Sequence, residues 1–174
     1  MNHTYGERRL RWLPEVEVRQ IIARSANPLL LDTVFFYGLR RSEVGLIKRS
    51  DVERDGIWIT ALKRRKPFRQ FMPLVEPLKS KLLKYLMSHG HEYLFPGYSG
   101  HGVSGEMVAK IWRDAAPKGV SAHVLRHSRA MAFSEKGMPI EDCSYWLRHS
   151  SIKSTECYYK ISATRAKNIA LAMA

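Results

Sequence analysis

Apolar residues recur every three or four positions along most of the chain, which is the period of an α-helix with one buried face. Leu78, Leu82, Leu83 and Leu86 show this spacing clearly. The segments with helical signals, and therefore the expected helices, cover residues 14–22, 28–37, a short stretch from 42, 75–89, 105–115, 123–136, 139–147, 151–159 and 162–174.

One part of the chain has a different pattern. The turn signal Asp55-Gly56 precedes Ile57-Trp58-Ile59-Thr60, a run of residues that favour strands, and residues 68–74 form a second such run. The basic segment 63–67 lies between the two runs, so we expect an antiparallel hairpin with a positively charged tip. The predicted fold class is therefore mainly α, formally α+β, with a small antiparallel sheet inserted early among the helices.

The pattern indicates a single domain. The sequence has no internal repeat and no long linker, and 174 residues suit one domain of ordinary size. We expect residues 1–12 to be a basic lead or linker and residues 13–174 to form the domain. Residues 1–13 lack an apolar h-region, so no signal peptide is expected. The longest apolar runs, 28–31 and 34–37, are far shorter than the roughly 20 residues that cross a bilayer.

Composition narrows the function classes. Apolar residues make up 45% of the chain and aromatic residues 10%, which excludes a disordered acidic or low-complexity protein. Lys and Arg number 29 against 16 Asp and Glu, for a formal net charge of +13. Such a surplus favours a polyanionic partner, although ribosomal and membrane-surface proteins share it. Cys143 and Cys157 cannot form a disulfide framework and indicate thiols in a reducing, cytoplasmic environment.

Several common catalytic signatures are absent from the sequence. It contains no GxxxxGKS/T phosphate loop, no GxGxxG motif and no CxxC zinc motif. The carboxylates are scattered, without the pairs or triads of two-metal nucleases. His123 and His127 stand four positions apart, a spacing that admits zinc, but the glutamate of an HExxH motif is missing. We therefore expect no cofactor and no metal, and a chemistry of cations, imidazoles, hydroxyls and thiols.

Three clusters of polar residues could carry such chemistry. His123, Arg126 and His127 lie three and four positions apart, on one side of a predicted helix. Arg40 closely follows the helix-ending Gly38, and a histidine near another helix end precedes two tyrosines. Each cluster alone is equally typical of a solvated helix face or a helix cap. Their combination and order are specific.

Together the clusters resemble the tyrosine site-specific recombinases, also called the phage integrase family. Residues 38–43, Gly-Leu-Arg-Arg-Ser-Glu, resemble its first arginine box, and residues 123–128, His-Val-Leu-Arg-His-Ser, resemble its His-x-x-Arg box. Residues 147–152, with Thr155 and Tyr158, resemble the final box, in which the nucleophilic tyrosine stands nine positions after the histidine. The resemblance covers nearly the whole chain and implies the helical catalytic domain of that family.

The resemblance implies a role for each residue of the boxes. Arg40 and Arg126 would clamp the non-bridging oxygens of the scissile phosphate, which gain charge as phosphorus is attacked. His123 and His149 would add hydrogen bonds to that phosphate, and His123 is a candidate general base. Tyr158 would attack phosphorus and form a 3′-phosphotyrosyl bond. That bond keeps the energy of the cleaved phosphodiester, so religation needs no ATP.

In this family a lysine of the hairpin protonates the 5′-hydroxyl leaving group. Counting forward from the start of the first strand selects Lys63. Counting back from the second strand selects a position near Lys66. We choose Lys63, with Lys66 as the alternative.

The sequence departs from the family pattern at two positions and in length. Tyr37 stands where a small hydroxyl residue is common, and Arg148 replaces the usual glycine before the histidine. Neither is a catalytic group, so we expect effects on packing and DNA contact. The chain has no room for the N-terminal domain with which most members enclose DNA. It would then be the catalytic domain of a longer protein, or a short recombinase like those of fimbrial switches.

The implied function is site-specific recombination of double-stranded DNA, by integration, excision or inversion. The resemblance also implies a tetramer in the synaptic complex, a monomer or dimer when free, DNA-bending accessory proteins and a location at the nucleoid. The segment from about residue 160 to residue 174 would form a helix that is exchanged between protomers, or one that folds back in cis. Two alternatives are a DNA-binding regulator without strand cleavage and a type IB topoisomerase, which shares the chemistry but needs no defined site.

Overall fold

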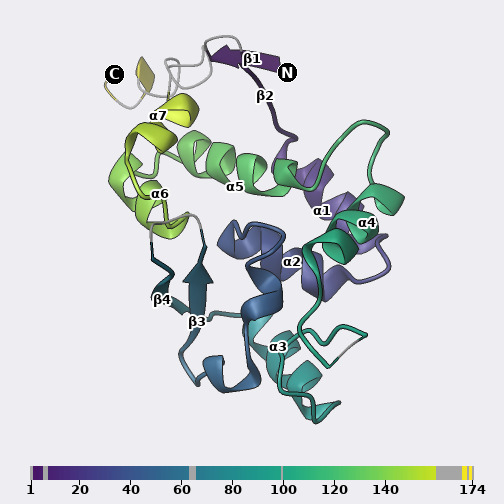
Figure 1. Cartoon of the computed structure of the whole chain (residues 1–174). Helices are drawn as coiled ribbons and strands as arrows, with labels where there is room; N and C mark the ends of the chain where they lie inside the picture. The colour runs from purple at the N-terminus through teal and green to yellow at the C-terminus, as the bar shows by residue number, and fades with distance from the viewer. Residues whose placement is uncertain are drawn as a thin grey trace.

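The computed structural model describes residues 2–5, 8–62, 66–98, 100–159, 170, 171 and 173. Its strands are β1 (Asn2–Tyr5), β2 (Arg8–Arg11), β3 (Gly56–Ala61) and β4 (Phe68–Pro73). Its helices are α1 (Glu15–Ala23), α2 (Pro28–Tyr37), α3 (Leu78–Met87), α4 (Gly105–Ala115), α5 (His123–Glu135), α6 (Ile140–Trp146) and α7 (Lys153–Tyr159), with 3₁₀ turns at Val44–Leu46 and Arg49–Asp51. Helix α5 runs across the molecule and packs on α2 (Figure 1).

Local sequence explains where the best-defined helices begin and end. Asn27 caps α2 with its side chain, Pro28 occupies the first turn, and Gly38 ends the helix at a φ of +58°. Ser104 caps α4 in the same way as Asn27 caps α2. Both helices have the bounds predicted from the sequence.

The predicted hairpin is present. Strands β3 and β4 pair antiparallel, in a register that runs from Gly56 opposite Pro73 to Ala61 opposite Phe68. The tip at residues 63–65 lies outside the described residues. Alternate side chains of β3 are buried in the core, whereas Trp58 on its other face packs against a phenylalanine of β4.

Three parts of the chain differ from the sequence-based expectation. Strands β1 and β2 pair in a segment for which no element was predicted. The short helix expected from Ser42 is a series of turns followed by the 3₁₀ turn Val44–Leu46. Helix α3 begins at Leu78 rather than near residue 75, because Pro77 disfavours helical geometry in the residue before it.

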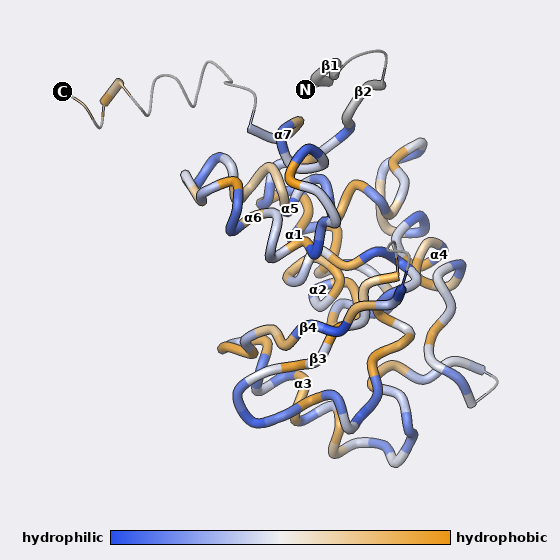
Figure 2. Tube along the Cα trace, turned by 60° about the vertical axis from the view of Figure 1, so that its left-hand side comes forward, coloured by the Kyte–Doolittle hydropathy of each residue, from blue (hydrophilic) through white to orange (hydrophobic). Residues whose placement is uncertain are grey.

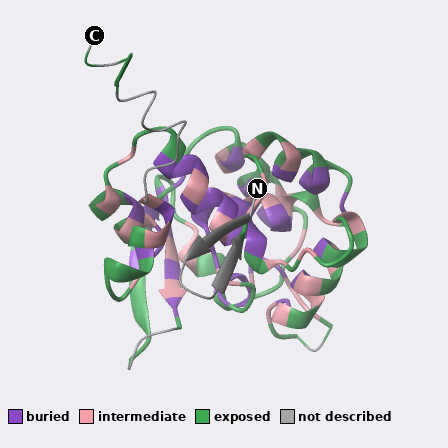
Figure 3. Cartoon of the chain, turned by 90° about the horizontal axis from the view of Figure 1, so that it is seen from above, coloured by how far each residue is buried: buried purple, intermediate pink, exposed green. Residues whose placement is uncertain are grey.

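The core has two parts. The larger cluster joins α1, α2, α3, α4, the β3–β4 hairpin and the first half of α5. The smaller cluster lies between α5, α6 and α7 and consists of Ala130, Phe133, Cys143, Leu147 and Tyr158. Buried residues accordingly face inward on these helices (Figure 3). The predicted nucleophile is thus part of a packed cluster, which fixes its position.

Hydrophobic and hydrophilic residues are interspersed along the described helices (Figure 2), as expected of amphipathic helices, in which the two kinds lie on opposite faces. Within the described part of the chain, no helix combines the length and the apolar character that a membrane span would need.

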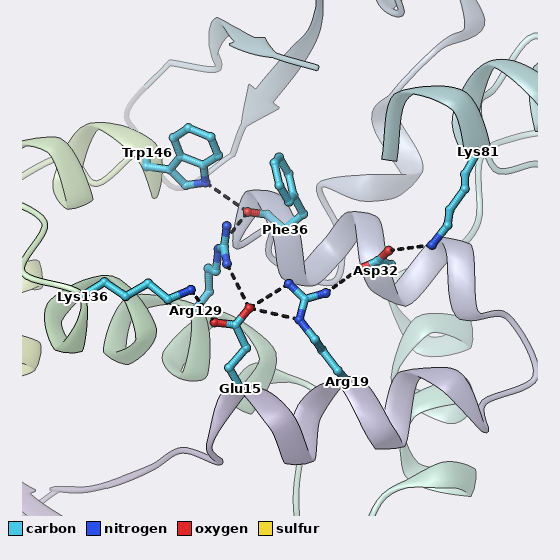
Figure 4. Close-up of polar contacts among 8 residues, drawn as sticks. All are labelled: Glu15, Arg19, Asp32, Phe36, Lys81, Arg129, Lys136 and Trp146. Atoms are coloured by element: carbon cyan, nitrogen blue, oxygen red, sulfur yellow. Dashed lines mark hydrogen bonds and ion pairs between the residues drawn. The ribbon is translucent and has the colours of Figure 1, made fainter. Parts of the chain in front are cut away.

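A network of charged side chains ties α1 and α5 to α2 (Figure 4). Glu15 accepts hydrogen bonds from Arg19, with Nη2 at 2.7 Å, and from Lys136, with Nζ at 2.8 Å. It also lies 3.8 Å from Nη1 of Arg129. Nε of Arg129 in turn donates to the Phe36 carbonyl at 3.1 Å. The network therefore fixes α5 against the end of α2, just before the first arginine box.

Gly38 ends α2 in a left-handed turn, and it also packs closely against a neighbouring side chain. A Cβ at Gly38 would lie 2.4 Å from Cδ2 of Leu147, on a backbone with φ of +58°. We expect Gly38→Ala to lower the free energy of unfolding by about 2–4 kcal/mol, from left-handed strain and overpacking together. The matched control is Gly137→Ala, where φ is +76° but a Cβ meets nothing within 4 Å. Urea unfolding of both variants measures the difference, and equal losses would contradict the packing argument.

Candidate active site

Arg126 is the buried centre of the candidate site. Arg126 lies on α5 and is only 3% exposed. Nη1 donates to the Gly38 carbonyl at 2.5 Å, and Nη2 donates to the Leu147 carbonyl. Gly38 and Leu147 are the C-cap residues of α2 and α6, so one guanidinium joins the first and last boxes. Burial, with the charges of Arg40 and Arg148, lowers the pKa of Arg126 to about 9. The side chain therefore stays charged at neutral pH.

Arg40 lies in the turn after α2 and is held by Glu43. The fully buried Glu43 carboxylate accepts from the Arg40 backbone N–H at 2.9 Å and from Nη1 at 2.6 Å. It also accepts from the Leu62 backbone N–H, at the end of the hairpin, at 3.4 Å. One carboxylate thus orients Arg40 and ties its turn to the hairpin. The Arg40 side chain remains 21% exposed, so part of the guanidinium is open to a ligand.

His149 follows α6 and is oriented by α7. Its Nδ1 lies 2.7 Å from Oγ1 of Thr155, another residue of the last box. Burial, followed by the charges of Arg126, Arg40 and Arg148, lowers the pKa of His149 to about 3. The imidazole is therefore neutral at pH 7, and the arginines of both arginine boxes lie near it.

Tyr158 lies on α7 and is 5% exposed. Its hydroxyl forms a hydrogen bond with Nδ1 of His127, and the two ring centroids are 5.6 Å apart. The His127 ring in turn packs edge-on against the ring of the exposed His123, with the two ring centroids 4.3 Å apart. Burial raises the pKa of Tyr158, and the charge of Arg126 acts in the opposite direction. The family resemblance assigned no catalytic role to His127, although its spacing from His123 and Arg126 was a signal.

The structure therefore brings most of the predicted residues to one place, the face of α5 that meets the ends of α2, α6 and α7. These residues are Arg40, His123, Arg126, His149 and Tyr158. Lys63 lies outside the described residues, and Lys66 is exposed two positions before β4. The chemical roles of all these residues stay predictions.

Arg148 forms a second bridge behind Arg126. Its φ of +54° is in the left-handed region that favours glycine. Its guanidinium donates to the Tyr37 carbonyl at 2.9 Å and to the Trp146 carbonyl at 2.6 Å. The Tyr37 hydroxyl donates to the Pro73 carbonyl at 3.0 Å. Arg148 thus joins the end of α2 to the end of α6, and the Tyr37 hydroxyl joins α2 to β4.

A cavity of about 620 Å³ opens beside Arg40. It is lined by the first arginine box, α4 and the start of α5, including Arg41, Arg113 and His123. Such a lining favours anions such as phosphate. Across the described ranges, no three His, Cys, Asp or Glu side chains gather in a way that could hold a metal ion.

Burial of neutral His149 makes stability depend on pH. Its folded pKa is about 3, against an ordinary 6.5, so between these values the unfolded chain binds more protons than the folded one. The free energy of unfolding therefore falls as the pH is lowered through this range, by up to about 1.4 kcal/mol per pH unit for this group. In His149→Gln, urea unfolding at a series of pH values should show a shallower decline. A slope equal to that of the wild type would contradict this account.

The sequence matches one known family over most of its length. Residues 11–165 match the phage integrase family. The chain is 32% identical to tyrosine recombinase XerC of Neisseria meningitidis serogroup B (strain ATCC BAA-335 / MC58) over 142 residues, which cover 76% of this chain and 46% of that protein. It is 25% identical to tyrosine recombinase XerA of Pyrococcus furiosus over 168 residues, which cover 89% of this chain and 59% of that protein. The chain spans about half the length of the curated relatives it matches.

Solved structures show the same fold. A crystal structure of XerA recombinase superimposes with a TM-score of 0.77 at 22% identity, covering 98% of this chain and 66% of that one. A lambda integrase dimer bound to a COC′ core site gives a TM-score of 0.69 at 19% identity, and the match covers 86% of this chain and 61% of that one. The predicted fold class, mainly helical with a small antiparallel sheet, is confirmed.

Proposed function

Because the chain belongs to the phage integrase family, we propose that it is the catalytic part of a site-specific DNA recombinase, which cleaves and rejoins strands through a 3′-phosphotyrosyl intermediate. The observation that carries the proposal is the meeting of the three boxes. Arg126 bridges the first box to the last, and Tyr158 lies within the field of its charge. Fixed cations beside a buried tyrosine suit phosphoryl transfer to that tyrosine.

The arginines stabilise the charge that develops on the phosphate. Each guanidinium has five N–H donors in a fixed fork. Glu43 occupies part of the Arg40 fork, and two carbonyls occupy part of the Arg126 fork. The remaining N–H groups are held in place before substrate arrives, which is the preorganisation that lowers a barrier. Neutral His149, oriented by Thr155, adds a hydrogen bond to the same phosphate.

Tyr158 is the nucleophile. Its Oη loses its proton to a basic side chain of the site and forms a bond to phosphorus as the bond from phosphorus to the 5′ oxygen breaks. The leaving oxygen takes a proton from the hairpin lysine, Lys63 or else Lys66. Reversal of this step by the 5′-hydroxyl of another strand completes the exchange.

The substrate is double-stranded DNA. The net charge of +13 and the cationic cavity beside Arg40 favour a polyanion. Structural neighbours include lambda integrase bound to a core site and XerH recombinase bound to its difH substrate in a pre-cleavage complex. From the family resemblance we also propose that the chain acts at the nucleoid in the cytoplasm, in a synaptic tetramer with DNA-bending accessory proteins. The proposed exchange segment at about 160–174 falls almost entirely outside the described residues.

The test is covalent capture on a suicide substrate. A pool of nicked duplexes with a randomised core is incubated with the chain, in EDTA and without ATP, and resolved on a denaturing protein gel. We expect a slowly migrating protein–DNA adduct. Binding without adduct, for the chain alone and for the chain fused to a relative's N-terminal clamp domain, would contradict the proposal. A DNA-binding regulator would then be favoured.

A further inference from the structure

We propose that His127 is the general base that takes the proton of Tyr158 as that residue attacks phosphorus. This inference rests on the proposed function and adds a catalytic residue to it. The observation that carries it is the hydrogen bond between the Tyr158 hydroxyl and Nδ1 of His127, the two atoms between which the proton would move.

Packing makes this contact a fixed feature of the fold. Helix α7 packs against α5 (Figure 1), so the tyrosine and the histidine face each other from two held helices. His127 follows Arg126 directly, so adjacent residues of α5 would serve the nucleophile and the phosphate. Tyr158 is only 5% exposed, so bulk water is poorly placed to accept its proton.

The charge state of His127 suits a base. Burial, followed by the charges of His123 and Arg126, lowers its pKa to about 4, so the ring is neutral at pH 7. Tyr158 faces it from α7, and His149 lies nearby in the turn between α6 and α7. A phosphate bound by Arg126 would offset the guanidinium charge. His127 would therefore become a stronger base when substrate arrives.

The other two histidines of the site occupy different positions. His149 has its Nδ1 against the hydroxyl of Thr155 and lies among the arginines. His123 is exposed at the first position of α5 and packs against the His127 ring. The family resemblance made His123 the candidate base. The structure puts His127 in hydrogen-bond contact with the nucleophile.

The proton balance of the step is complete. The Tyr158 O–H bond breaks, the bond from Oη to phosphorus forms, and the bond to the 5′ oxygen breaks. Nδ1 of His127 holds the tyrosine proton, so the ring becomes an imidazolium. The hairpin lysine supplies the proton of the leaving 5′-hydroxyl. In religation, His127 returns its proton to the tyrosine oxygen as that oxygen leaves phosphorus.

The first test needs no DNA and no cleavage. Nitrogen-15 NMR of the wild-type chain at pH 7 reports which ring nitrogen of His127 carries the proton, once its ring signals are assigned through bonds from its backbone resonances. We expect the proton on Nε2, with Nδ1 accepting from Tyr158. A proton on Nδ1 would overturn the inference, whether or not the chain cleaves DNA. Failure of the inference is thus distinct from failure of the proposed function.

The second test separates a base from a hydrogen-bond partner. Glutamine keeps an acceptor for the tyrosine hydroxyl but cannot take its proton. On a duplex recovered from the adduct pool, His127→Gln should form adduct about 10²-fold or more slowly at pH 7, with a rate that rises about tenfold per pH unit. The wild-type rate should change little between pH 6 and 8.

A modified substrate isolates the base from the acid. Sulfur in place of the 5′ bridging oxygen leaves without protonation, so the His127→Gln defect should persist on it. His101→Gln, at an exposed histidine of the loop before α4, should react as the wild type does. A near wild-type rate or pH profile for His127→Gln would overturn the inference. If that variant does not fold, the tautomer measurement on the wild-type chain decides.

Discussion

Tyr158→Phe is expected to abolish the covalent adduct while DNA binding persists. The change removes the attacking oxygen, and no other group replaces it at that position. The phenyl ring still fills its place in the cluster with Phe133, Cys143 and Leu147, so the fold is retained. The lost hydrogen bond to His127 should cost about 1–3 kcal/mol of stability. Denaturing gels for adduct, and gel shifts for binding, measure the two properties separately.

Tyr159→Phe is the matched control, because it removes a hydroxyl from the next residue. The Tyr159 hydroxyl donates a hydrogen bond to the Pro139 carbonyl, at 3.4 Å. It is Tyr158, not Tyr159, that forms the hydrogen bond with His127. We expect this variant to keep forming adduct. An adduct that survives Tyr158→Phe and disappears in Tyr159→Phe would show that the assignment of the nucleophile is wrong.

Arg126→Lys is expected to slow adduct formation about 10²- to 10³-fold at saturating DNA, because a preorganised forked donor is lost. Lysine keeps the charge but cannot bridge the Gly38 and Leu147 carbonyls as the guanidinium does. Each carbonyl left unpaired should cost about 1–3 kcal/mol of stability. The rate is therefore measured well below the unfolding temperature of the variant, with urea unfolding as the parallel measurement.

The control for this substitution is Arg24→Lys. Arg24 is exposed and also donates to a backbone carbonyl, that of Ala115, with Nε at 3.1 Å. It lies outside the boxes, so its replacement should leave the rate of adduct formation unchanged. If Arg126→Lys reacts as fast as Arg24→Lys, the bridge between the boxes has no catalytic value.

Elements with strong local signals could be predicted from the sequence. Helix α2 has an asparagine cap, a proline in its first turn and a terminal glycine, and these fix its ends whatever surrounds it. The β3–β4 hairpin follows from its turn signal and two runs of strand formers. The β1–β2 pair has no such signal, because short strands depend on pairing with each other.

The candidate site could be predicted in its members but not in its contacts. The boxes predicted which residues form the site. The hydrogen bond from Arg126 to Gly38, however, joins residues 88 positions apart and depends on how α5 packs on α2. Glu43 was included in the first arginine box without a role of its own, whereas it is buried and orients Arg40. His127 was missed as a partner of Tyr158 because that contact exists only once α7 has packed against α5.

The central claim is that DNA becomes joined through its 3′ phosphate to Tyr158. Trypsin cleaves after Lys153 and Lys160, so digestion of the adduct releases Ser154–Lys160, which contains both Tyr158 and Tyr159. Fragmentation of this peptide in a mass spectrometer assigns the nucleotide to one tyrosine, and end-labelling of the released strand shows which terminus is free. We predict a nucleotide on Tyr158 and a free 5′-hydroxyl on the released strand. A nucleotide on another residue, or a free 3′-hydroxyl, would contradict the account.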